Sequence, residues 1–280
     1  RSVAVSQIIG NVLVLVLPLL VALAGRTDLA ALIGASLAGR LLGLAPLASA
    51  VWRALLAGSR PVLVRAEVRL LSRYGAWIMV SGLVGPLMVM ADRFLIGAMI
   101  GAAAVAAYAI PFQIASRVQI LPMAIVQALF PRFAAEEGEA ARRRCRDFAV
   151  LVGLLFAPVS IGLIALAGPL LALWLGKALD PRSVPVAQWL LAGFWTNAVA
   201  NVPYGYIQAR GNPRFTALLH VAELPFYAAA LVLLGGAFGL AGYAAAFALR
   251  CAIDAVVLCR RAGVLEARAL PALAVPAVLV

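Results

Sequence analysis

The sequence predicts an all-α, polytopic helical membrane protein. Hydrophobic residues make up 65% of the 280 residues and charged residues only 12%, and the mean hydropathy is +1.04. Apolar runs near twenty residues long recur along the chain, and most arginines fall in every second gap between them. A helix needs about twenty residues to cross roughly 30 Å of hydrocarbon. This composition excludes a soluble globular core.

About nine apolar runs are predicted to span the membrane. The last one stops at the chain end and the first residue is Arg1 rather than Met, so we expect the chain to be a fragment. In order, the runs are 6–25, 29–49, 74–98, 102–130, 148–175, 184–208, 215–236, 239–259 and 269–280.

The distribution of positive charge predicts the orientation. Gaps on one side hold most of the arginines, whereas those on the other side hold only Arg26, Arg93, Lys177 and Arg182. The positive-inside rule places the arginine-rich side in the cytoplasm, as in a multi-pass protein of a bacterial inner membrane. The net charge of +12 lies in short loops beside apolar helices, so we expect membrane lipids as partners and no nucleic acid.

The two longest basic gaps differ in their predicted roles. In 50–73, arginines recur every four residues from Arg65, which predicts an amphipathic helix on the inner leaflet or a solvated linker. The predicted domains are therefore 1–49, a cytoplasmic linker at 50–73, a helical group at 74–259, and the start of another span at 260–280. The second gap, 131–147, is interpreted as a solvated loop or as a contact with headgroups or a partner.

Ionisable residues inside the spans are the main functional candidates, since placing one in a bilayer costs at least about 2.5–3.5 kcal/mol. Each should face protein or water. They are Arg40, Asp92, Arg93, Arg117, His220, Glu223, Arg250 and Asp254.

Helical spacing predicts which of these act together. Arg250 and Asp254 are four residues apart, which predicts a structural ion pair, with a substrate role as the alternative. His220 and Glu223 share a face near the bilayer midplane, where a carboxylate could carry a proton or pack as a neutral group. Asp92 is a second candidate for binding a coupling ion.

Polar residues in two further spans are candidates for a substrate cavity. Gln113 and Arg117 share a face between Pro111 and Pro122, and prolines let a helix bend. Arginine suits bidentate phosphate binding, so we expect either a phosphorylated substrate or a salt bridge from Arg117 to Asp92. Asn197 and Asn201 share a face and either line a cavity or tie helices together.

Catalytic motifs are scarce. The sequence has one histidine and no H-E-x-x-H, Walker A or G-x-S-x-G motif,. The cysteines, Cys145, Cys251 and Cys259, lack C-x-x-C spacing. We therefore expect no metal, no cofactor and no enzyme activity, and transport is the favoured interpretation.

Several short motifs resemble those of polysaccharide (O-antigen type) flippases of the multidrug/oligosaccharidyl-lipid/polysaccharide exporter superfamily. The similarity extends over about 74–259. It rests on ADRFLIG at 91–97, YAIP at 108–111, LFPR at 129–132, NVP at 201–203, QARGNP at 208–213, ELP at 223–225 and GLAG at 239–242.

This resemblance implies two six-helix lobes around a central cavity. The chain would hold the last two helices of the first lobe, at 1–49, and all six of the second. The implied function is flipping of an undecaprenyl-diphosphate-linked oligosaccharide by alternating access. Arg40 and Arg117 would face the diphosphate, and Glu223 or Asp92 would couple transport to an ion. The resemblance does not identify a polymerase or ligase partner.

Three other functions remain open. A multidrug or cation antiporter of the same superfamily would share the fold, although its cavity typically has fewer cations. A lipid-linked-glycan enzyme should carry a large outer loop, whereas the longest outer gap here is about 176–183. A structural membrane scaffold would gain nothing from ionisable groups at midmembrane depth.

Overall fold

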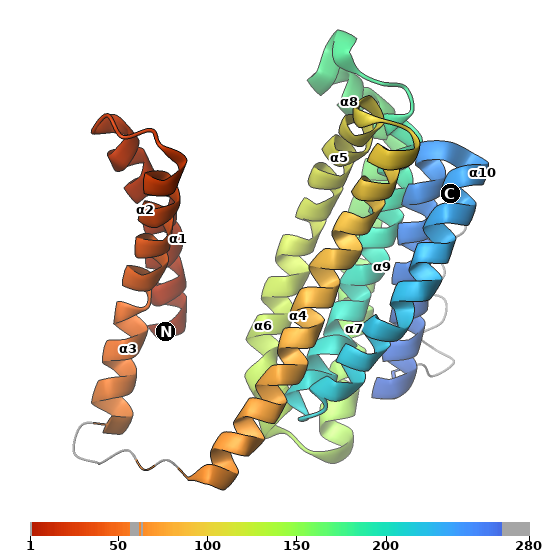
Figure 1. Cartoon of the computed structure of the whole chain (residues 1–280). Helices are drawn as coiled ribbons and strands as arrows, with labels where there is room; N and C mark the ends of the chain where they lie inside the picture. Colours follow the sequence, from red (N-terminus) through yellow and green to blue (C-terminus); the bar gives the residue numbers. More distant parts are fainter. Residues whose placement is uncertain (1, 57–61, 63, 265–280) are drawn as a thin grey trace. The chain divides into compact units, whose positions relative to one another are not determined.

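The computed structural model describes residues 2–56, 62 and 64–264, and within them every regular element is a helix (Figure 1). Six helical stretches in this part are long and apolar enough to cross a membrane. The prediction of an all-α, multi-pass membrane protein is confirmed. The span predicted at 269–280 lies outside the described residues. The chain divides into two compact units, Arg1–Val68 (unit 1) and Arg69–Val280 (unit 2).

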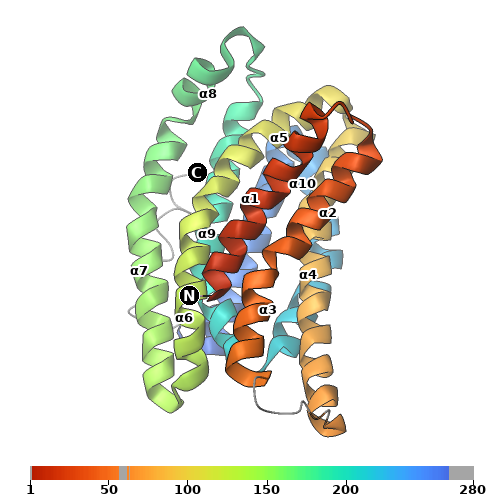
Figure 2. The same ribbon diagram turned by 90° about the vertical axis from the view of Figure 1, so that its left-hand side faces the viewer.

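Unit 1 is built on a hairpin of two close helices. Helix α1 (Ser2–Leu23) packs along α2 (Leu29–Gly43), as Figure 2 shows. Asp28 caps α2 by accepting a hydrogen bond from the Ala31 N–H at 3.0 Å. A short helix, α3 (Ala45–Val51), continues the span predicted at 29–49 to Val51, and a π-helical turn, Trp52–Leu56, follows in the predicted linker. Pro46 lies in the first turn of α3, where its missing N–H costs no helical hydrogen bond,.

The hairpin depends on the absence of side chains at its crossing point. A Cβ at Gly43 would lie 2.3 Å from the Gly10 Cα, and one at Gly39 would lie 2.7 Å from the Leu13 carbonyl carbon. The Ser6 hydroxyl donates to the Gly43 carbonyl across the same interface. Lipid tails are as apolar as leucine, so close backbone packing and such hydrogen bonds hold membrane helices together.

The described part of unit 2 contains seven α-helices. They are α4 (Arg65–Met99, whose first turn falls in unit 1), α5 (Ala102–Ser116), α6 (Ile120–Ala135), α7 (Gly138–Ala165), α8 (Ala167–Leu175), α9 (Ser183–Ala209) and α10 (Pro213–Ala262). The helix predicted in the linker's second half is present, but it runs without a break into the span predicted at 74–98. Both are part of α4, because no proline lies between Arg65, where the helix begins, and Pro86,.

Helix α10 contains two predicted spans folded back on each other. At Gly239 the backbone leaves the helical region (φ 59°, ψ −139°), and Figure 1 shows the two arms running side by side in opposite directions. We call 213–238 the first arm and 240–262 the second arm. A Cβ at Gly235 would meet the Tyr243 ring at 2.5 Å, which shows how closely the arms pack beside the turn.

Helix α9 is the centre of unit 2 and packs against α5, α6, α7, α8 and α10. It was predicted as a span, yet it is not among the stretches that are apolar enough by hydropathy alone. Its polar side chains explain the difference, since they bond to neighbouring helices instead of facing lipid. Trp195, for example, donates from Nε1 to the Gly153 carbonyl of α7 at 3.1 Å.

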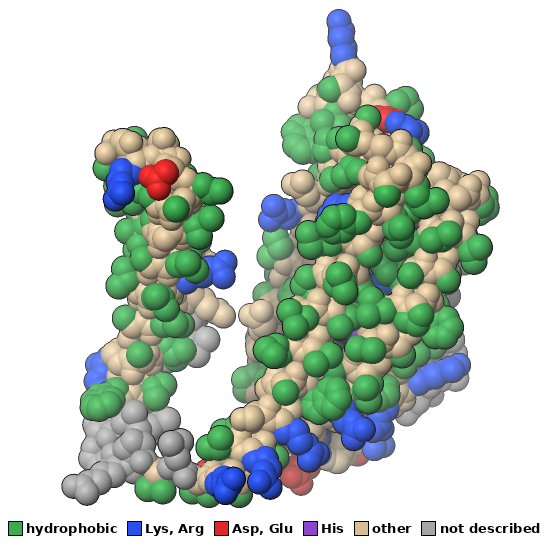
Figure 3. Space-filling view, viewed as in Figure 1, with side chains coloured by type: hydrophobic (Ala, Val, Ile, Leu, Met, Phe, Trp, Pro, Cys, Tyr) green, Lys and Arg blue, Asp and Glu red, His purple; other side chains and the backbone are tan. Residues whose placement is uncertain are grey.

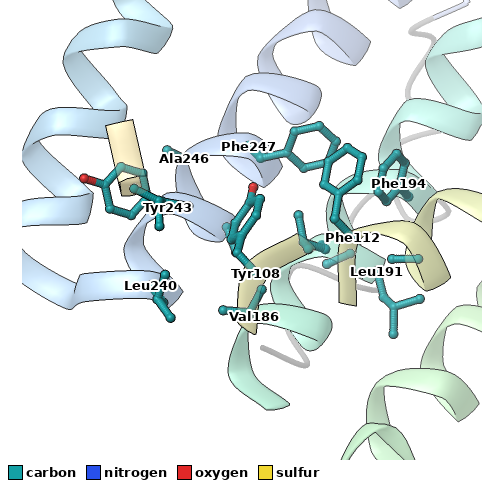
Figure 4. Close-up of a cluster of buried hydrophobic side chains, with 14 of the residues drawn as sticks. Tyr108, Phe112, Val186, Leu191, Phe194, Leu240, Tyr243, Ala246 and Phe247 are labelled. Carbon is teal, nitrogen blue, oxygen red and sulfur yellow. The ribbon is translucent and has the colours of Figure 1, made fainter. Parts of the chain in front are cut away.

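Aromatic side chains fill one part of the core. Phe112 of α5, Phe194 of α9 and Phe247 of the second arm meet with ring centres 4.9–5.7 Å apart (Figure 4). Gly193 lets α10 approach, because a Cβ there would lie 2.9 Å from the Phe247 ring. The three cysteines are buried and unbonded to one another.

We predict that Gly43→Ala destabilises the chain. The added methyl group would push against the Gly10 backbone, and overpacking of this kind costs about 1–3 kcal/mol. The midpoint of thermal unfolding in detergent should fall by several degrees. Gly34→Ala is the matched control, because a Cβ at Gly34 of the same helix meets no atom within 4 Å. Equal midpoints for the two variants would contradict the close packing of α1 and α2.

Candidate functional site

Ionisable and phenolic side chains from α4, α5 and both arms of α10 gather inside unit 2. We call this group the buried charge cluster. Hydrogen bonds, an ion pair and electrostatic interactions connect its members. They are Asp92, Arg93, Tyr108, Glu223, Tyr227, Arg250 and Asp254.

Asp92 is held at the α4 side of the cluster. Its side chain is fully buried, and one carboxylate oxygen accepts a hydrogen bond from the Tyr108 hydroxyl of α5 at 2.6 Å. The other accepts from the Arg93 N–H at 2.7 Å. Arg93 and Arg250 provide the nearby positive charge. These bonds fix the carboxylate in a place where hydrocarbon would offer it no partner.

Arg250 is the central cation of the cluster. Only 13% of its side chain is exposed, and Nη1 lies 3.9 Å from Glu223 Oε2. The guanidinium also faces the rings of Tyr227 and Phe247 at 5.6 and 5.5 Å. The guanidinium also contacts two sulfur atoms, Met88 Sδ at 3.9 Å and Cys251 Sγ at 3.5 Å.

The ion pair predicted between Arg250 and Asp254 needs correction. Within the described residues, the carboxylate at ion-pair distance from Arg250 is that of Glu223, and Asp254 interacts electrostatically with Arg250 and lies beside the Glu223 carboxyl group. Oδ1 of Asp254 and both Glu223 oxygens lack a hydrogen-bond partner in this part of the chain. The spacing rule considers one helix at a time, whereas the fold at Gly239 brings the first arm against Arg250.

The cluster contains more acid than base. Its carboxyl groups are Asp92, Glu223 and Asp254, and its guanidiniums are Arg93 and Arg250. With every group ionised the sum is −1, in a place where an uncompensated charge is costly. The cluster therefore has the composition to accept one positive charge.

His220 lies one turn before Glu223 on the first arm. Its ring stacks on Tyr204 of α9, with ring centres 5.6 Å apart and an interplanar angle of 11°. Its Nδ1 is buried without a hydrogen-bond partner among the described residues. Electrostatic contact with Arg250 connects it to the buried charge cluster.

The predicted cavity residues of α4 to α6 do not meet at one point. Arg93 is half-buried and lies over the Phe112 ring at 4.4 Å. Gln113 and Arg117 are exposed on unit 2. The salt bridge suggested between Arg117 and Asp92 is not formed among the described residues, because Arg117 begins a separate 3-10 turn, Arg117–Gln119. Pro122 favours that turn, since it cannot bond to the carbonyl four residues earlier.

An amide pair ties the start of α6 to α9. Asn201 donates from Nδ2 to Gln119 Oε1 at 3.0 Å, and Gln119 donates from Nε2 to the Phe194 carbonyl at 2.6 Å. Of the two predictions for Asn201, the structure shows the helix tie. Asn197 is half-buried one turn earlier. The sequence reasoning missed Gln119, although a glutamine in the middle of a span is itself a signal.

Two predictions remain, the cavity residue Arg40 of unit 1 and the absence of a metal site. Arg40 lies in the last turn of α2 with an exposed side chain. Among the described residues, no group of three or more His, Cys, Asp or Glu side chains is arranged to hold a metal ion.

Comparison with known proteins identifies the family. The family model described as polysaccharide biosynthesis protein matches residues 1–183. The chain belongs to this family. It is also 35% identical over 186 residues to a Shigella flexneri protein named "Putative O-antigen transporter". The aligned part is 66% of this chain and 44% of that protein, so the chain spans less than half of this relative's length. No solved structure matches the chain.

These findings confirm the family resemblance that the motifs indicated, since the matched family is one of polysaccharide biosynthesis proteins. The family match covers both helices of the unit 1 hairpin and continues through α8 in unit 2. The ADRFLIG motif lies within the matched region and contributes Asp92 and Arg93 to the buried charge cluster.

We predict that Arg250→Gln strongly destabilises the chain. It would leave Glu223 and Asp254 without their cation, and breaking a buried pair in this way costs about 3–5 kcal/mol. The midpoint of thermal unfolding in detergent should therefore fall clearly. In a Glu223→Gln background the same substitution should cost less, since one of the stranded charges is gone.

Arg143→Gln is the control for this pair of variants. Arg143 is 67% exposed and paired with Glu139 at 3.5 Å, so its replacement should change the midpoint little. If Arg250→Gln proved as mild as Arg143→Gln, Arg250 would not be the cation that the buried carboxylates need.

Proposed function

We propose that this chain is part of a flippase that moves undecaprenyl-diphosphate-linked oligosaccharide from the inner to the outer leaflet of the bacterial inner membrane. The carrying observation is membership of the polysaccharide biosynthesis family by a multi-pass helical membrane protein. The O-antigen transporter name of the Shigella relative supports the same function. A transporter, not an enzyme, is proposed.

Alternating access provides the mechanism of this proposal. Unit 1 would belong to the first lobe and unit 2 would hold all six helices of the second, and the lobes would rock during transport. The exposed guanidiniums of Arg40 and Arg117 are the proposed contacts for the diphosphate. Arginine suits this role because its planar fork binds phosphate oxygens in pairs.

The buried charge cluster is proposed as the coupling site. Glu223 and Asp254 share one guanidinium, and their free oxygens can take up a proton or a small cation. Binding of one positive charge would bring the net charge of the cluster to zero. It would thereby change the electrostatic interactions between α4 and the two arms of α10. Such a change is a way to favour one lobe orientation over another, because a ligand shifts an equilibrium only through its different affinity for the two states.

Complementation tests the function. The gene that encodes this chain is expressed in a bacterium that lacks its O-antigen flippase, and surface glycan is measured. Restored glycan supports the proposal. Absence of glycan together with export of a cationic dye would instead identify a multidrug antiporter of the same superfamily.

We predict that Glu223→Gln reduces glycan export at least about tenfold while the protein remains in the membrane. The amide keeps the size of the side chain but removes the carboxylate that binds the coupling ion. Glu139→Gln is the control, because Glu139 is 60% exposed and outside the cluster. Export at the wild-type level by Glu223→Gln would remove this residue from the coupling site.

We predict that Arg117→Ala also reduces export, through a weaker hold on the substrate's diphosphate. Arg117→Lys should retain part of the activity, since lysine keeps the charge and loses the planar fork. Arg132→Ala is the control, an exposed arginine in the last turn of α6 and outside the predicted span that holds Arg117. If both alanine variants exported equally, Arg117 would have no special contact with the substrate.

A further inference from the structure

A polar cavity of about 270 Å³ lies where the basic ends of α7, α9 and α10 meet. Figure 3 shows Lys and Arg side chains gathered at the end of unit 2 where α4 begins. At roughly 30 Å³ per water, the cavity would hold about nine waters, which is enough for a headgroup phosphate and its neighbouring atoms. Its lining includes Arg142, Arg210, Arg261, Asn212, Tyr206 and Ile207.

The arginines of this cavity come from different elements. Arg142 lies in the second turn of α7 and its side chain extends against Gly263, the C-cap of α10. Arg210 is the C-cap of α9 and donates to the Glu136 carbonyl at 2.8 Å. Arg261 lies in the last turn of α10, with its guanidinium 5.3 Å from the Phe215 ring centre. Each side chain is thus anchored on protein.

Two carboxylates near the cavity, those of Glu136 and Glu139, are engaged by other arginines, whereas Glu137 is exposed and makes no capping hydrogen bond. Glu136 pairs with Arg144 at 2.7 Å, and Glu139 pairs with Arg143 at 3.5 Å. In the part of the chain that the structure describes, no ion pair joins a carboxylate to the three cavity arginines. Among the described residues, the three arginines therefore face one cavity without an ion-pair partner.

Helix ends do not remove this positive charge. The C-termini of α9 and α10 each contribute roughly half a negative charge, and the N-termini of α7 and α10 roughly half a positive one, so they nearly cancel. At α7 the N-cap residue, Glu137, makes no capping hydrogen bond through its side chain. The first N–H groups of α7 lie beside Gly138 in the cavity lining and add donors for an anion,.

We propose that this cavity binds the phosphate group of an anionic membrane lipid from the leaflet at the basic end of unit 2. The site lies at the ends of apolar helices, where headgroups lie. Tyr206 and Ile207 offer apolar wall beside the guanidiniums, which suits an amphiphile. The phosphate belongs to a phospholipid or to a lipid diphosphate. The proposal does not depend on the transport function.

Lipid binding by the purified full chain in detergent tests the site. The probes are phosphatidylglycerol, phosphatidylcholine, farnesyl diphosphate and inorganic phosphate, and bound lipid is counted by native mass spectrometry over a titration. The test variant is Arg142→Gln/Arg261→Gln. The matched control is Arg132→Gln/Arg143→Gln, which removes the same charge from exposed arginines outside the cavity lining. Unfolding midpoints without lipid show that both variants are folded.

The expected result is that the test variant binds an anionic lipid about tenfold or more weakly, through loss of charge-assisted hydrogen bonds, while the control stays near wild type. Selective loss with phosphatidylglycerol identifies a phospholipid as the source, and loss with farnesyl diphosphate alone identifies a lipid diphosphate. Full competition by inorganic phosphate at equal concentration identifies free phosphate and overturns a lipid site. Equal losses in both variants, or none, would show only diffuse attraction and also overturn the proposal.

Discussion

A buried guanidinium in the middle of a membrane helix constrains the whole of unit 2. Hydrocarbon offers no partner to Arg250, so the charge persists there only if another segment brings carboxylates to it. The first arm of α10 does this by returning along the second arm, which places Glu223 3.9 Å from the guanidinium. That arrangement needs the non-helical turn at Gly239 and the close approach of the arms at Gly235. The pairing of Arg250 with Glu223 therefore depends on the folding of the two arms into a hairpin.

The need for buried polar groups to find partners also explains why α9 can lie inside the bundle although hydropathy alone does not mark it as a span. A helix surrounded by protein can carry amides if each amide finds a partner, because the alternative is an unsatisfied polar group in an apolar medium. Asn201 donates to Gln119 at 3.0 Å, and Gln119 in turn donates to the Phe194 carbonyl. Helix α9 therefore connects the amide pair on one side with the stacked Tyr204 and His220 on another.

The spans could be predicted from the sequence, but the partners inside them could not. Helix length in a bilayer is set by hydrocarbon thickness, so twenty-residue apolar runs gave the elements and isolated the ionisable residues. Partner choice depends on which helices touch and in which register. Glu223 and Asp254 lie at nearly equal distances along the chain from Gly239, at the junction of the spans predicted at 215–236 and 239–259. The spacing rule was applied within one span only, so it paired Arg250 with Asp254 and left out Glu223 of the neighbouring span.

The two sites of unit 2 differ in the sign of their charge, and therefore in the sign of the ligand that each can bind. The buried charge cluster sums to −1 with all groups ionised, so it would repel a diphosphate and attract a proton or a small cation. The cavity of Arg142, Arg210 and Arg261 has the opposite sign and lies at the helix ends. A substrate phosphate that entered the cluster would also lose its hydration in a site that already lacks donors for Glu223 and Asp254,. Under the proposed function, a phosphate group would be bound at exposed arginines and the coupling charge inside the bundle, so that the two would not compete for Arg250.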